Sequence, residues 1–74
     1  MTVLTKSDKL QIIESRVRSL EYKKYSLEID VIVENAKSAP DQDAIGVINT
    51  SIAEIEDQVL ALNSELTAVN LLTE

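Results

Sequence analysis

The sequence predicts an all-α protein in which two long helices form an antiparallel hairpin and pack along a heptad-spaced, coiled-coil-like apolar seam. Three features support this fold class. Apolar residues recur at alternating steps of three and four in both halves of the 74-residue chain, the only proline separates the halves, and all seven Lys and Arg precede residue 38. A chain of this length holds one domain, which we place at residues 1–74.

The first helix is expected at about residues 6–37. Thr5-Lys6-Ser7-Asp8 has the spacing of a capping box, which marks a helix start. The seam of this helix has eight positions at the alternating spacing: Leu10, Ile13, Val17, Leu20, Lys24, Leu27, Val31 and Glu34. Six of the eight are apolar, so this helix has a core-facing side that Lys24 and Glu34 interrupt.

The break between the helices is expected at about residues 38–40. Pro40 has no backbone N–H and disfavours helical geometry in the residue before it, so it belongs in the first turn of a new helix. Ser38 and Asp41 are spaced as a helix cap, and Asp43 suits the positive end of the helix. Because the link is short, the two helices are expected to lie antiparallel.

The second helix is expected at about residues 40–72. All eight of its seam positions are apolar: Ile45, Ile48, Ile52, Ile55, Val59, Leu62, Leu66 and Val69. Gly46 inside this helix costs about 1 kcal/mol relative to alanine, and Ser51-Ile52-Ala53-Glu54 is a second capping box, so a start near residue 51 stays open. A further alternative is a strand at residues 29–33, where β-branched residues cluster.

Lys24 is the one base at a seam position. Its aliphatic stem can lie on the seam while its amine reaches a carboxylate at the rim. In an antiparallel hairpin that turns near residue 39, Lys24 falls opposite residues 53–56, where Glu54 and Glu56 lie. A polar seam residue can instead fix the register or the oligomeric state, and a functional contact is the third alternative.

Both helices carry more apolar residues than one pair of helices can bury. An apolar face wider than the seam is typical of helices that contact two neighbours in a bundle. β-branched residues at both kinds of seam position, as in Ile45 and Ile48, also favour more than two helices. We therefore expect a homo-oligomer, most simply a dimer that forms a four-helix bundle. Alternatively, another protein binds the same side chains. The candidate interface comprises Tyr22, Tyr25, Ile29, Ile32, Val33, Val47, Leu60 and Leu71.

Catalysis is not expected. The chain has no Cys and no His, which removes disulfides, the commonest metal ligands and the commonest general base. One glycine in the chain excludes a glycine-rich phosphate loop. The segment from Asp41 to Gly46 begins like a calcium loop, but Ile45 and Ile52 stand where oxygen ligands are required. We therefore expect no catalytic residue, no cofactor and no metal site.

The net charge of −6 is divided unevenly. Residues 1–37 hold seven bases and six acids, whereas residues 38–74 hold seven acids and no base, so unlike charge favours pairing of the two halves. The bases Arg16, Arg18, Lys23 and Lys24 lie near the two tyrosines, which supports an alternative function as a small nucleic-acid-binding regulator. The net negative charge opposes that alternative at long range.

No signal peptide and no membrane-spanning pattern is visible in the sequence, so a cytoplasmic protein is expected. With catalysis set aside, the seam and the extra apolar residues predict a non-enzymatic, self-associating helical hairpin. Such a small acidic protein would act as an assembly, scaffold or adaptor element through protein–protein contacts.

Overall fold

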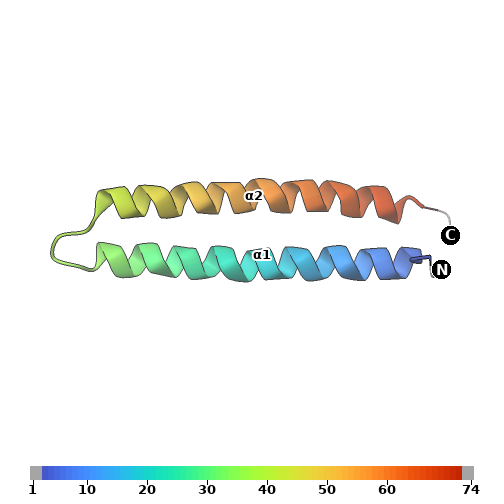
Figure 1. Ribbon diagram of the computed structural model, residues 1–74, viewed down its shortest axis with the longest axis horizontal. Coiled ribbons are helices and arrows are strands. Elements are labelled where there is room, and N and C mark those ends of the chain that lie inside the picture. Colours follow the sequence, from blue (N-terminus) through green and yellow to red (C-terminus); the bar gives the residue numbers. More distant parts are fainter. Residues whose placement is uncertain (1–2, 73–74) are drawn as a thin grey trace.

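Two helices lie side by side and run in opposite directions in the computed structural model, which describes residues 3–72 (Figure 1). Helix α1 spans Lys6–Asn35 and helix α2 spans Gln42–Asn70. They pack into a rod of 57 × 18 × 16 Å. The prediction of an all-helical hairpin is confirmed. The ends of the expected 1–74 domain, residues 1–2 and 73–74, lie outside the described residues.

Both open alternatives for the local structure are wrong. Residues 29–33 are helical, and no strand occurs between residues 3 and 72. Helix α2 also passes through residue 51 without a break, so the capping box at residues 51–54 is unused. Apolar burial at helical spacing outweighs both local signals, because each residue of the continuous helix adds to the same buried side.

Helix α1 begins where the capping box predicts. The Thr5 hydroxyl accepts a hydrogen bond from the backbone N–H of Asp8 at 3.1 Å, and the Asp8 carboxylate accepts one from the N–H of Thr5 at 3.1 Å. These bonds satisfy backbone donors that the first helical turn leaves without partners. The helix ends at Asn35, two residues before the expected end at residue 37, and Ala36 is its C-cap.

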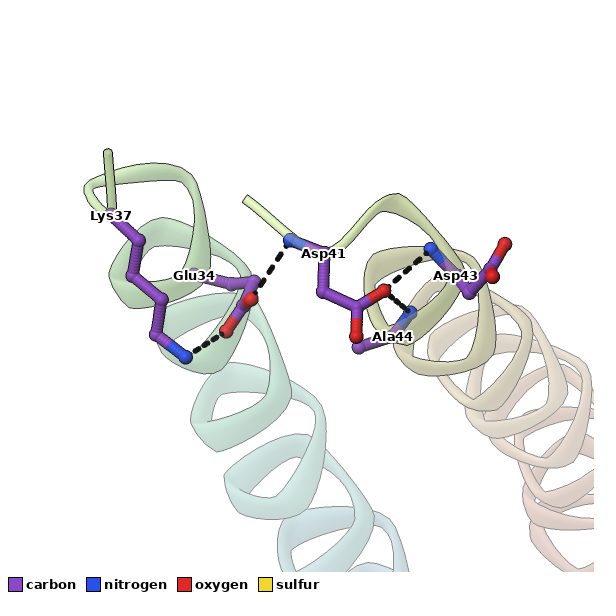
Figure 2. Close-up of polar contacts among 5 residues, drawn as sticks. All are labelled: Glu34, Lys37, Asp41, Asp43 and Ala44. Carbon is purple, nitrogen blue, oxygen red and sulfur yellow. Dashed lines mark hydrogen bonds and ion pairs between the residues drawn. The ribbon is translucent and has the colours of Figure 1, made fainter. Parts of the chain in front are cut away.

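The start of α2 differs from the expectation, because Asp41 and not Ser38 is its N-cap. Figure 2 shows the Asp41 carboxylate accepting hydrogen bonds from the N–H groups of Asp43 at 3.0 Å and Ala44 at 3.1 Å. Glu34 of α1 accepts the N–H of Asp41 itself at 2.9 Å. Asp41 has an extended conformation, Pro40 lies before the cap and not inside the helix, and the turn covers residues 36–41.

The same carboxylate joins the turn to α1. The ammonium of Lys37 lies 2.7 Å from the Glu34 carboxylate, whose side chain is largely shielded from solvent (Figure 2). The hydrogen bond from Lys37, followed by the one from the Asp41 N–H, holds the pKa of Glu34 below its ordinary value of 4.5. The hydrogen bond to Glu34 in turn raises the pKa of Lys37. Both shifts favour the charged forms at neutral pH.

A lysine of α1 closes the opposite end of the rod. The Lys6 ammonium donates hydrogen bonds to the carbonyl oxygens of Asn70 at 2.9 Å and Leu72 at 3.1 Å. The last turn of α2 contains no base of its own. Helix C-termini present unpaired carbonyls and partial negative charge. The Lys6 ammonium of α1 therefore supplies the hydrogen-bond donors and the positive charge for the C-terminus of α2.

The core is a line of aliphatic side chains between the helices. Ile13 of α1 and Ile45, Ile55 and Val69 of α2 are buried. Every other residue at the alternating three- and four-residue spacing in either helix is half-buried, Lys24 and Glu34 included. The spacing therefore identifies the side of each helix that faces the other helix.

Candidate interaction surface

The large apolar side chains outside this core are exposed. All eight residues of the candidate interface are among them, with Ile29 the least exposed at 37% and Leu71 the most exposed at 77%. Among residues 3–72, the exposed large apolar residues are Val3, Leu4, Ile12, Tyr22, Tyr25, Ile29, Ile32, Val33, Val47, Leu60, Leu71 and Leu72. A side chain that stays in water contributes no hydrophobic stabilisation, so these residues gain only from a further contact.

The structure does not bring the eight candidates onto one surface. Tyr22, Tyr25, Ile29 and Ile32 follow one side of α1 at steps of three, four and three residues, so they form a continuous line. The three candidates on α2 are scattered along that helix at residues 47, 60 and 71. Val33, the remaining candidate, is also exposed on α1.

Tyr25 and Leu60 both line an open groove between the two helices, together with Lys24, Glu28 and Glu56. The Lys24 ammonium lies 3.4 Å from the Glu56 carboxylate across the groove and 3.9 Å from that of Glu28 on its own helix. The prediction that Lys24 reaches a carboxylate of residues 53–56 is therefore confirmed, and Glu56 is the partner.

Arg18 and Tyr22 form a pair that the sequence reasoning missed. The Arg18 guanidinium carbon lies 5.4 Å from the centre of the Tyr22 ring, and its Nη2 donates a 3.4 Å hydrogen bond to the Tyr22 hydroxyl. Residues four apart are neighbours on a helix, so the spacing alone could have revealed this pair. The two side chains line a shallow hollow on α1 together with Glu21 and Tyr25.

The four candidate nucleic-acid contacts do not form a continuous basic face. Arg16 lines a groove with Ser19 and Leu20 of α1 and with Gln58 and Ala61 of α2, on a different side from the groove that contains Lys24. The charges of Arg18 and Lys24 are engaged by Tyr22 and by the two glutamates, respectively, and Lys23 is exposed. Residues two apart, such as 16 and 18, point about 200° apart on a helix, and this divides the bases.

Several acidic side chains make contacts within the hairpin: Asp8, Glu28, Glu34, Asp41 and Glu56. Between residues 3 and 72, no group of three or more His, Cys, Asp or Glu side chains is placed to hold a metal ion. The Asp41 carboxylate, which begins the calcium-like segment, accepts two backbone N–H bonds as a helix cap. Neither described helix combines the length and the apolar character needed to cross a membrane.

Comparisons with known proteins add no relative. No protein-family model matches the chain, and no curated protein and no solved structure matches it either. What the chain does is therefore inferred from its own side chains.

Proposed function

We propose that this chain is a non-enzymatic helical hairpin that self-associates and serves as an assembly, scaffold or adaptor element. Two hairpins related by a twofold axis make a four-helix bundle, the simplest closed arrangement for helices with apolar residues on more than one side. The observation that carries this proposal is the amount of surface that the single hairpin leaves in water.

The solvent-accessible surface of the chain is 5644 Å². A compact monomer of 8.2 kDa is expected to expose about 4,500 Å². The rod-like hairpin therefore exposes about 1,100 Å² more than a compact protein of its mass, and its exposed residues include large apolar side chains. If each of two copies removed that excess from water, their interface would bury about 2,200 Å², which is in the range of obligate homodimers.

The composition of the core supports the same conclusion. None of its side chains is completely shielded from solvent, and the core contains no aromatic residue and no disulfide. Chains below about 80 residues rarely obtain more than roughly 3–5 kcal/mol from one core, and many gain the remainder by oligomerisation. In the proposed bundle, the heptad-spaced residues of both helices pack in the knobs-into-holes manner of coiled coils.

Size-exclusion chromatography with light scattering tests the proposal at micromolar concentration. We expect the mass of two chains, together with a melting temperature that rises with protein concentration, because dissociation accompanies unfolding of a dimer. A particle with the mass of one chain and the full helical circular-dichroism signal would contradict self-association.

A further inference from the structure

One side of α1 carries a second apolar line that is exposed to solvent, and of its members Tyr25 borders the groove between the helices. Four residues of α1 and its C-cap residue Ala36 form it at steps of three, four, three and four, and we name this line the outer stripe: Tyr22, Tyr25, Ile29, Ile32 and Ala36. Ile29 is two residues from Leu27 and from Val31, which face α2, so it points about 200° away from them. All five residues of the outer stripe are exposed.

The spacing of the outer stripe is the same as that of the α1 residues that pack on α2. Alternating steps of three and four keep apolar side chains on one side of a helix over several turns, which is the pattern of a helix–helix contact. Helix α1 is therefore built to lie between two helices, and α2 occupies only one of the two places.

The corresponding side of α2 is not built in this way. Its equivalent positions are mostly acidic, hydroxylated or small: Asp43, Gly46, Thr50, Ala53, Asp57, Leu60, Ser64, Thr67 and Leu71. Burial of the carboxylates of Asp43 and Asp57 without cationic partners would be costly. Helix α2 is therefore suited to remain at the outside of an assembly.

Charge leads to the same arrangement. Residues 42–70, which form α2, contain five acids and no Lys or Arg, whereas α1 contains both signs. Contact between the α2 helices of two copies would place like charges together, and contact between the α1 helices would leave the acids of α2 in water. A second copy that binds through its α1 thus meets the least repulsion.

We propose that the outer stripe binds the outer stripe of a second copy, so that the helices are ordered α2–α1–α1–α2 with the two α1 helices antiparallel about a twofold axis between Ile29 and Ile32. This inference rests on the proposed self-association and names the surface that performs it. The four helices then lie in a row and not in a closed bundle, because the outer stripe and the α2-facing residues lie on nearly opposite sides of α1. The antiparallel direction places Ile29 against Ile32, and the large Tyr25 against the small Ala36. Large side chains then face small ones, as close packing requires.

The antiparallel arrangement also suits the charges and hydroxyls at the edges of the outer stripe. Glu28 lies beside Asn35 of the second copy in this register and not beside another Glu28. The tyrosine rings lie toward the ends of the contact, where a hydroxyl can stay hydrated while the ring is buried.

Two matched substitutions test which helix makes the contact. Ile32 on α1 is 62% exposed and Leu60 on α2 is 67% exposed, so aspartate at either position should leave the single hairpin folded, as circular dichroism can verify. We expect Ile32→Asp to reduce the mass measured by light scattering by half, and Leu60→Asp to leave it at two chains.

The outcomes separate this inference from the proposed function. A wild-type chain that is monomeric overturns both. A dimeric wild type whose mass is halved by Leu60→Asp, with or without an effect of Ile32→Asp, overturns the outer stripe and leaves self-association standing. A dimer that neither substitution dissociates also overturns the outer stripe and leaves self-association standing.

Disulfide cross-linking tests the direction of the two α1 helices. The chain has no cysteine, so an introduced one reports only its own contacts. Bridged residues require Cα atoms roughly 4.4–6.8 Å apart. We expect a mixture of Tyr25→Cys and Ala36→Cys chains to cross-link as a heterodimer, while each variant alone does not. Cross-linking of each variant with itself, without the heterodimer, would overturn the antiparallel arrangement.

Discussion

Replacement of Lys24 by leucine should stabilise the protein. Lys24 is the only base at a seam position, and its side chain is 33% exposed. Its charge is balanced by Glu56 at 3.4 Å and Glu28 at 3.9 Å, whose side chains are 56% and 44% exposed. The substitution therefore exchanges a hydrated ion pair for apolar contact at a largely shielded position.

The magnitude follows from these exposures. An ion pair between side chains this accessible contributes about 0–1 kcal/mol. Complete burial of a leucine is worth about 1.5–3 kcal/mol relative to an exposed one, and roughly two-thirds of that gain applies at this position. Since the lysine stem already makes part of the contact, we expect a net stabilisation of about 1 kcal/mol. In a domain of this size that corresponds to a rise in melting temperature of roughly 4–8 °C.

Thermal unfolding followed by circular dichroism at one fixed protein concentration measures this change. Lys23→Leu is the matched control, because Lys23 is exposed and a surface substitution should change stability by no more than about 0.5 kcal/mol. The advantage of Lys24→Leu should also grow with salt, which screens the wild-type ion pair. A melting temperature several degrees below that of the wild type would refute the reasoning, since it would mean that the charge of Lys24 is required.

Two further substitutions test the turn and α2. Glu34→Gln removes a carboxylate whose pKa in the folded protein lies below 4.5. The variant should therefore melt at a lower temperature than the wild type at neutral pH. That advantage of Glu34 should shrink once the pH falls below 4.5, the ordinary pKa of the carboxyl, and it should be lost as the pH falls through the lowered pKa of the folded state. A difference in melting temperature that did not shrink with falling pH would disprove the pKa argument. Gly46→Ala should stabilise α2 by about 1 kcal/mol, because a Cβ at this position meets nothing within 4 Å. Urea unfolding measures this change, and destabilisation would mean that another helix lies close to Gly46.

The helical hairpin could be predicted from the sequence because its signals are local and repeat. Leucine, isoleucine and valine at alternating steps of three and four define one side of each helix, and Pro40 separates the two runs. The start at Lys6 was also predictable, since Thr5 and Asp8 form a complete capping box within four residues. Repetition over many turns outweighs a single conflicting residue such as Gly46.

The details that escaped prediction depend on contacts between residues far apart in the chain. Asp41, the cap of α2, donates its N–H to Glu34, which lies seven residues earlier on the other helix. Lys6 binds carbonyls 64 and 66 residues later, a contact that exists only once the hairpin has closed. The division of the candidate interface, by contrast, was accessible, because the direction of each side chain follows from its residue number at 100° per residue.

The contacts around the turn also give the hairpin an order in which to form. Only residues 36–41 separate the helices, so the entropy lost on closing the loop is smallest for contacts next to the turn and grows with distance from it. Glu34 and Asp41 can therefore meet early, after which the core pairs close successively towards Lys6. Folding that begins at such a short loop is fast, since each later contact extends a structure that is already aligned. The end of the rod at Lys6 is therefore the last part to close. It is also the first part to fray when the Lys6 ammonium leaves the carbonyls of α2.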